Sequence, residues 1–196
     1  MDSHIKNIVL YDQDIREPLF DYLEERFGKS RIFEEKTIGK SRADILLLTQ
    51  EQVIGLEIKS DMDTYERLKR QVLDYNTYCD RNYAVIGRTH EKNIEEHIPE
   101  FWGVLSVRVE DGKMVIEEKR AAQDNPKMKK EMQFTLLWRA ELQHLLEYNR
   151  LPKYRQKSKK FIRQKLLEKM DWETLKKQMC EELFERDYTL LNNEEE

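Results

Sequence analysis

Runs of apolar residues of strand length alternate with amphipathic helical stretches along most of the chain. The clearest pair of runs spans 42–48 and 53–59, separated by a polar break. Two such runs around a four-residue turn predict an antiparallel hairpin. Because strand side chains alternate between faces, Glu57 and Lys59 should share one face, and Asp44 on the partner strand can lie beside Glu57.

The elements around this hairpin follow the order of an α/β protein. The pattern predicts a helix over 14–27, strands over 31–38, 42–48 and 53–59, a long helix over 63–79, a strand over 83–87, a short helix over 91–98, and strands over 101–107 and 113–117. A strand, a helix and a further strand form a right-handed crossover, so the strands before and after the long helix should be parallel. We therefore expect a mixed central sheet flanked by helices.

The composition changes between Lys119 and Lys130, where the chain becomes polar and basic. We place a boundary there, with one domain over 1–122 and a small all-helical C-terminal region over 123–196. Within this region the segment 150–165 contains no acid, and aromatic side chains are interleaved with its charges. Its basic residues are Arg150, Lys153, Arg155, Lys157, Lys159, Lys160, Arg163 and Lys165.

Overall composition indicates a globular protein that needs local patches to bind an anionic partner. Hydrophobic residues make up 39% of the chain, enough for a core, and the net charge is −4, so the protein as a whole is no polycation. Its two cysteines have no metal-binding spacing, which fits a reducing compartment. We find neither a membrane-length apolar run nor a signal-peptide pattern, and we expect a cytoplasmic protein with no membrane partner.

The hairpin carries the candidate chemistry. Asp44, Glu57 and Lys59 would bring two carboxylates and an ammonium group to one end of the sheet. Neighbouring carboxylates repel each other unless a cation lies between them, and oxygen ligands of this kind suit Mg²⁺ or Mn²⁺. The alternative is that Asp44 caps a turn and that Glu57 and Lys59 form a same-face ion pair. The apolar character of the hairpin argues against this alternative.

An Asp followed on the next strand by Glu-X-Lys resembles the signature of the PD-(D/E)XK nuclease superfamily, which has the restriction-endonuclease-like fold. Asp44 and Glu57-Ile58-Lys59 match it, with Ala43 in place of the usual proline. Gln71 and Tyr75 lie four residues apart on one helix face. They match the Gln-x-x-x-Tyr element of the superfamily's RecB-like branch. The resemblance covers roughly residues 14–109.

The resemblance implies a metal-dependent nuclease that hydrolyses DNA phosphodiester bonds and leaves a 5′-phosphate. It implies that Asp44, Glu57 and the backbone carbonyl of Ile58 hold Mg²⁺ or Mn²⁺, and that Lys59 orients the attacking water or stabilises charge on the phosphate. Gln71 and Tyr75 would fix Lys59 and the DNA backbone. The first helix of the superfamily often supplies a further acidic ligand, for which Glu17 is our candidate, with helix capping as its alternative role. Many members act as homodimers, so a homodimer is a further expectation.

Basic residues in two regions are candidates for contact with nucleic acid. Near the predicted site these are Lys40, Arg42, Arg67 and Arg70, and in the C-terminal region Lys153, Arg155, Lys157, Lys159, Lys160 and Arg163. The C-terminal helix, basic turn and helix over 141–170 loosely resemble the SAP-type DNA-binding module. The alternative in both regions is a solvated charged surface.

Three hypotheses follow. The first is a nuclease in DNA repair, recombination or defence. The second is a non-catalytic nucleic-acid-binding protein that keeps the fold and binds without metal. The third is a regulatory protein that docks to a partner through its amphipathic C-terminal helices. The complete set of Asp44, Glu57, Lys59, Gln71 and Tyr75 favours the first, because a protein that needs only the fold has no use for all of them.

Overall fold

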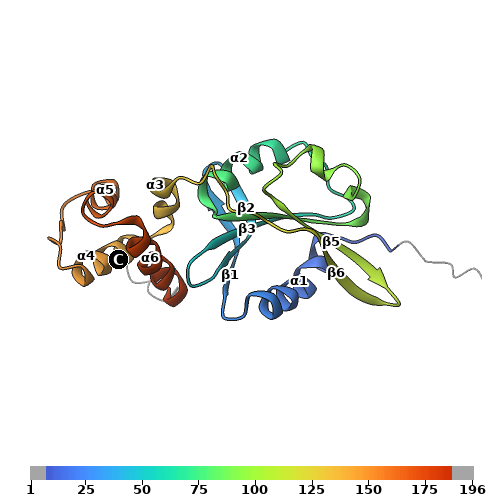
Figure 1. Ribbon diagram of the computed structural model, residues 1–196, viewed down its shortest axis with the longest axis horizontal. Helices are drawn as coiled ribbons and strands as arrows, with labels where there is room; N and C mark the ends of the chain where they lie inside the picture. The colour runs from blue at the N-terminus through green and yellow to red at the C-terminus, as the bar shows by residue number, and fades with distance from the viewer. Residues whose placement is uncertain (1–7, 187–196) are drawn as a thin grey trace, which may run out of the picture.

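A mixed six-stranded sheet forms the centre of the protein, in a computed structural model that describes residues 8–186 (Figure 1). Its strands are β1 (Arg31–Ile38), β2 (Ser41–Leu48), β3 (Val53–Lys59), β4 (Arg81–Ile86), β5 (Gly103–Glu110) and β6 (Lys113–Arg120). The helices are α1 (Asp12–Phe27), α2 (Leu68–Tyr78), α3 (Lys130–Gln133), α4 (Arg139–Tyr148), α5 (Lys159–Lys169) and α6 (Trp172–Glu185). Short 3₁₀ turns are η1 (Arg88–His90), η2 (Ile94–Glu96) and η3 (Phe134–Leu136).

The strands follow one another across the sheet in sequence order. β1, β2 and β3 are antiparallel, β3 and β4 are parallel, β4 and β5 are parallel, and β6 returns antiparallel to β5. The predicted hairpin and the parallel crossover through α2 are both confirmed. The fold is therefore the expected α/β arrangement with a mixed central sheet.

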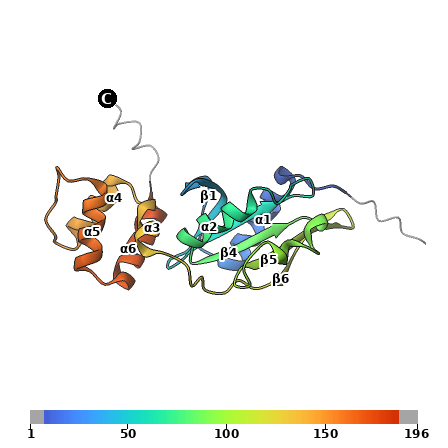
Figure 2. The same ribbon diagram turned by 90° about the horizontal axis from the view of Figure 1, so that it is seen from above.

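Each face of the sheet is covered by different helices, with α1 on one side and α2 on the other (Figures 1 and 2). The apolar stripe Ile15, Leu19 and Leu23 of α1 packs against a buried cluster that includes Leu47 and Leu56. α2 packs against the opposite face, and the buried cluster on this side continues into the C-terminal helices. Burial of both faces explains why β3 is buried along its whole length.

Two helix starts differ from the prediction, and the short helix expected over 91–98 is only the 3₁₀ turn η2. α1 begins at Asp12 rather than at residue 14, and Asp14 accepts a hydrogen bond from the backbone N–H of Tyr11. α2 begins at Leu68 rather than at residue 63. Asp63 instead accepts hydrogen bonds from the backbone N–H and hydroxyl of Ser60, which holds the chain in a turn ahead of the helix.

The C-terminal helices share a buried core with the sheet, although they form a separate lobe in outline (Figures 1 and 2). One apolar cluster joins Leu48 and Val53 of the hairpin to Leu142 of α4, Leu166 of α5 and Leu183 of α6. The sequence boundary near residue 122 thus marks a change of architecture, but the cluster continues across it. The division into domains stays a prediction.

Polar contacts also join this helical lobe to the sheet. Lys176 of α6 donates hydrogen bonds of 2.5 Å to Asp80 and to the side-chain oxygen of Gln133. Asp80 also accepts the backbone N–H of Val53 at 2.7 Å. The Lys176 and Asp80 side chains are 10% and 16% exposed, so their ion pair is largely shielded from water.

None of the helices within residues 8–186 is both long enough and apolar enough to span a membrane.

The buried Lys176–Asp80 pair gives a stability prediction. Lys176→Met should lower the free energy of unfolding by about 3–5 kcal/mol, because it leaves the Asp80 carboxylate buried without its cation. Lys177→Met is the matched control, since Lys177 pairs with Glu51 on the exposed surface and should cost less than about 1 kcal/mol. Urea denaturation of the full chain measures both. Equal losses would contradict a buried ionic link between the lobe and the sheet.

Candidate active site

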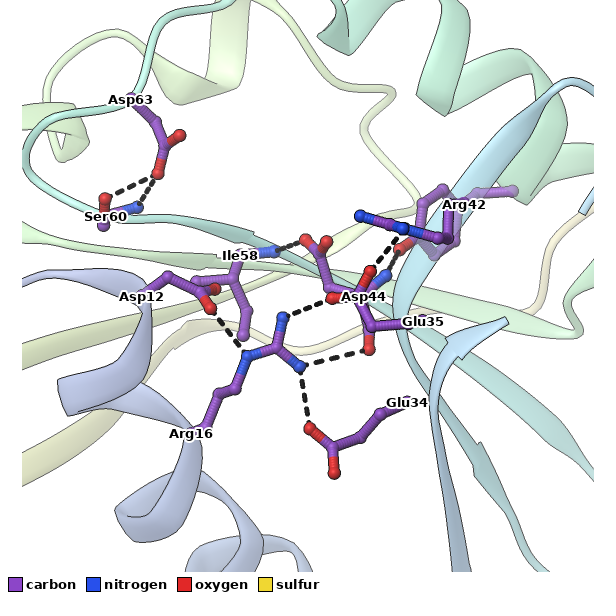
Figure 3. Close-up of polar contacts among 10 residues, drawn as sticks. Asp12, Arg16, Glu34, Glu35, Arg42, Asp44, Ile58, Ser60 and Asp63 are labelled. Atoms are coloured by element: carbon purple, nitrogen blue, oxygen red, sulfur yellow. Dashed lines mark hydrogen bonds and ion pairs between the residues drawn. The ribbon is translucent and has the colours of Figure 1, made fainter. Parts of the chain in front are cut away.

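The hairpin strands separate at Asp44. Their ladder runs from Leu48 opposite Val53 to Ile45 opposite Leu56 and stops there. Beyond that point the Asp44 side chain replaces a backbone partner, because its Oδ2 accepts the backbone N–H of Ile58 at 2.8 Å (Figure 3). The separation leaves Asp44 and Glu57 at an opening between the two strands.

The hydroxyl of Tyr75 lies in this opening. It accepts the backbone N–H of Asp44 at 3.0 Å and donates to the carbonyl of Leu56 at 2.9 Å. The ring reaches this position across Gly55, where an added Cβ would lie 2.4 Å from Tyr75 Cδ1. Glycine at position 55 is therefore a packing requirement, and it lets a helix side chain bridge two separated strands.

Glu57 and Lys59 share a face, as predicted, and form a buried pair. The Lys59 ammonium donates to Glu57 Oε1 at 2.6 Å and to Gln71 Oε1 at 3.3 Å. Glu57 is 0% exposed and Lys59 is 5% exposed. Glu57 Oε2 is buried and has no hydrogen-bond partner among residues 8–186. A buried acceptor without a partner is costly, and this makes Glu57 Oε2 a candidate ligand atom.

These side chains open into a cleft of about 720 Å³ between α1, the β1–β2 turn and the start of α2. Both acidic and basic side chains line it. The lining residues are Asp12, Arg16, Glu35, Lys40, Ser41, Arg42, Asp44, Glu57, Ile58, Lys59, Asp63, Glu66, Arg67, Arg70 and Gln71.

Electrostatics at the base of the cleft disfavours two ionised carboxylates. Burial, followed by the charge of Glu57, raises the pKa of Asp44 from 3.8 to about 7. Burial also raises the pKa of Glu57, against the opposing effect of Lys59. A carboxyl group with a strongly raised pKa in a cleft, as at Asp44, is typical of functional sites. A cation between Asp44 and Glu57 would favour the ionised forms of both.

The available donors fit Mg²⁺ or Mn²⁺. No group of three or more His, Cys, Asp or Glu side chains within residues 8–186 is arranged to hold a metal ion. The donor set that the resemblance implies is smaller: the carboxylates of Asp44 and Glu57 with the backbone carbonyl of Ile58, three residues that line the cleft. Mg²⁺ commonly binds proteins through one or two carboxylates and keeps several waters, so this small set of oxygen donors suits it.

The structure does not bring Glu17 to the cleft. Glu17 is exposed on α1 and does not line it, whereas Asp12, one turn earlier, does. Because α1 begins at Asp12, its first turn is the part that points at the site. The sequence did not predict Asp12 as a residue of the site, because its place there depends on where α1 begins. The charge of Asp12 also contributes to the raised pKa of Asp44.

Arg16 of α1 is a second residue that the sequence did not single out. It donates to Asp12 at 2.6 Å, to Glu34 at 2.9 Å and to Glu35 at 2.7 Å (Figure 3). Its Nη1 also lies 3.5 Å from the backbone carbonyl of Asp44. These partners come from α1, β1 and β2, so only the tertiary structure reveals the cluster.

The predicted basic residues fall into two separate groups. Lys40, Arg42, Arg67 and Arg70 line the cleft. The C-terminal residues Lys153, Arg155, Lys157, Lys159, Lys160 and Arg163 belong to α5 and the loop before it, and none of them lines the cleft. Tyr75 is fully buried and does not line the cleft, because its hydroxyl binds the backbone of Asp44 and Leu56.

Comparison with known families gives one match over nearly the whole chain. The family described as Bacteriophage P4 protein cII matches residues 6–193. The chain belongs to this family.

Other comparisons add little. No curated protein matches the chain. Among solved structures, SfsA of Pyrococcus furiosus in complex with Ca²⁺ is similar at 13% identity and a TM-score of 0.34, covering 60% of this chain and 63% of that one. The chain thus spans less than two thirds of the SfsA chain, and a similarity this slight carries no argument about function.

The bridge made by Tyr75 gives a prediction about stability. Tyr75→Phe keeps the ring but leaves the Asp44 N–H and the Leu56 carbonyl unpaired, so the free energy of unfolding should fall by about 1–3 kcal/mol. Tyr78→Phe on the same helix is the control, because the Tyr78 hydroxyl makes no hydrogen bond within the described part of the chain. Denaturant unfolding and faster amide exchange at Asp44 would report the loss. An unchanged exchange rate would argue against the bridge.

The raised pKa of Asp44 gives a prediction about pH. The carboxyl group binds its proton more tightly in the folded than in the unfolded chain, so without metal the unfolding free energy should fall as the pH rises from about 4 to about 7. In the Asp44→Asn variant the unfolding free energy should fall less over this pH range, because the titrating carboxyl group is absent. Thermal unfolding in EDTA at a series of pH values measures the difference. Identical pH profiles for parent and variant would contradict the raised pKa.

Proposed function

We propose that this protein is a metal-dependent nuclease that hydrolyses the phosphodiester bonds of DNA. The proposal rests on Glu57 Oε2, which is buried beside Asp44 and Lys59 at the base of an open cleft and has no partner among the residues that the structure describes. The resemblance of Asp44, Glu57-Ile58-Lys59 and Gln71 to the PD-(D/E)XK superfamily supports the same reaction.

The chain's own residues divide the work. Asp44, Glu57 and the carbonyl of Ile58 would hold Mg²⁺ or Mn²⁺, with Asp12 as the acidic residue of α1 that faces the same cleft. When bound, such a metal lowers the pKa of water and polarises the scissile phosphate. Lys59 is held by Glu57 and Gln71, so its ammonium group can orient the attacking water and stabilise charge that develops on the phosphate.

Basic side chains at the rim supply contacts to the nucleic-acid backbone. Arg67 and Arg70 at the start of α2 line the cleft and form no ion pair within residues 8–186. They are free to bind phosphates on either side of the scissile bond. The C-terminal basic segment is proposed as a separate contact, because its cations lie outside the cleft and outnumber their acidic partners. Of this segment, Lys153 pairs with Glu147 and Lys165 pairs with Glu168.

The proposal is tested by cleavage of circular and linear, single- and double-stranded DNA with Mg²⁺ or Mn²⁺. Glu57→Gln and Lys59→Met should each lower the rate by at least about 10²-fold, because both remove groups that act on the reacting phosphate. Circular substrates distinguish endonuclease from exonuclease action. Circular dichroism would confirm that both variants keep the fold.

Glu25→Gln is the matched control, since it removes an exposed carboxylate of α1 that lies outside the cleft. It should cleave at the parent rate. Equal cleavage by the parent and by Glu57→Gln would refute the assigned site. Salt-sensitive binding with no cleavage by the parent would favour the non-catalytic nucleic-acid-binding function.

A further inference from the structure

Glu35 occupies an unusual place in β1, beside the candidate site. Its φ is +53°, in the left-handed region that a non-glycine residue rarely adopts. The β1–β2 ladder pairs Glu34 with Ile45 and Lys36 with Ala43, but it skips the step between Glu35 and Asp44. Backbone strain of this kind persists where surrounding contacts hold it, and it is common at functional sites.

The kink changes where the acidic side chains point. Successive residues of a regular strand face opposite sides of the sheet. Here both Glu34 and Glu35 reach the same guanidinium group, that of Arg16 (Figure 3). The strained backbone at position 35 therefore serves to place the second carboxylate on the cleft side.

Glu35 uses its two oxygens on two different arginines. Oε1 accepts Arg16 Nη2 at 2.7 Å, and Oε2 lies 2.5 Å from Arg42 Nε (Figure 3). Arg16 is anchored by further carboxylates and its side chain is 17% exposed. Arg42 differs, because its side chain is 70% exposed and has no other ionic partner in the described part of the chain.

Arg42 thus keeps donors available for a ligand. Glu35 pairs with its Nε, while its two terminal nitrogens have no partner among residues 8–186 and lie at a cleft that Asp44 and Lys59 also line. A guanidinium group offers a planar pair of donors that matches a phosphate. The Glu35 carboxylate holds the guanidinium group at Nε rather than at its terminal nitrogens. This would reduce the conformational entropy that the Arg42 side chain loses when a phosphate binds.

We propose that Glu35 is a positioning residue that holds Arg42 at the cleft as a binding group for a nucleic-acid phosphate next to the scissile one. Arg16 is held in place by several carboxylates and fixes the position of Glu35. Glu35 in turn fixes the position of Arg42. The inference rests on the proposed function in so far as it concerns cleavage. Binding of a backbone phosphate by Arg42 does not require that cleavage follows.

The test is a double-mutant cycle of Glu35→Gln and Arg42→Ala on the full chain. Arg42→Ala should lower kcat/KM for DNA cleavage about tenfold while Glu35 is present, since loss of a positioned group can cost up to about 10²-fold. In the Glu35→Gln background the same change should have little effect, because Arg42 is no longer held. A tenfold effect of Arg42→Ala in both backgrounds would overturn the proposal.

Glu34→Gln is the matched control. Glu34 also binds Arg16, but it does not contact Arg42. The effects of Glu34→Gln and Arg42→Ala on kcat/KM should therefore multiply. Glu35→Gly is the second variant of position 35, because glycine accepts a positive φ. It should match or exceed the parent melting temperature and still lose the coupling to Arg42, whereas a purely structural Glu35 would lose stability without any change in coupling.

A metal-free measurement separates this inference from the nuclease proposal. Binding of a labelled DNA duplex is followed in EDTA at several salt concentrations. Arg42→Ala should reduce the slope of log K against log salt by about 0.9 with Glu35 present, the value for one lost phosphate contact. In the Glu35→Gln background the reduction should disappear. A parent that binds but does not cleave would refute the nuclease proposal alone, and a slope unaffected by Arg42→Ala would refute the role of Glu35.

Discussion

The separation of β2 from β3 at Asp44 is the constraint on which the candidate site depends. A continued ladder would pair the backbone groups of Asp44 and close the opening beside Glu57. The Tyr75 hydroxyl takes the place of a ladder partner for the Asp44 N–H and the Leu56 carbonyl, so the strands separate without leaving these groups unpaired. Gly55 makes this possible, because any side chain there would collide with the Tyr75 ring.

The buried carboxylates at this opening lower the stability of the protein when no cation is bound. Glu57 is buried with one oxygen on Lys59 and the other without a partner in the described part of the chain. The pKa of Asp44 is raised by burial and by the charge of Glu57. Burying carboxylates close together destabilises a fold unless they bind a cation or share a proton. Buried apolar clusters on both faces of the central strands offset this cost.

The C-terminal helices contribute to the site through α2, the helix that carries Gln71 and Tyr75. The Asn125 amide donates to the carbonyls of Asn76 and Cys79, where α2 ends, at 2.9 and 2.6 Å. The network of Lys176, Asp80 and Gln133 lies directly after this helix end. Since terminal carbonyls of a helix need partners, these contacts fix the end of α2 and with it the position of Tyr75. The helical lobe is thus part of the scaffold of the site.

Local sequence determined the elements of the sheet and much of the site. Period-two alternation in the hairpin placed Glu57 and Lys59 on one face, and a spacing of four placed Gln71 and Tyr75 together on one helix. These predictions succeeded because they depend only on the geometry of a single strand or helix. The starts of α1 and α2 were predicted less well. Asp14 lies inside the first turn of α1 and caps the N–H of Tyr11 from there, whereas Asp63 binds Ser60 in a turn ahead of α2.

Only the tertiary structure decided which acid of α1 lies in the cleft, that Tyr75 is a buried bridge, and that Arg16 joins three elements. It also revealed the strained Glu35 and its hold on Arg42. Each of these depends on side chains that are distant along the chain or on a backbone angle that residue type does not specify. Sequence pattern determines local periodicity, whereas contacts among α1, β1 and β2 arise only when the sheet and its helices pack together.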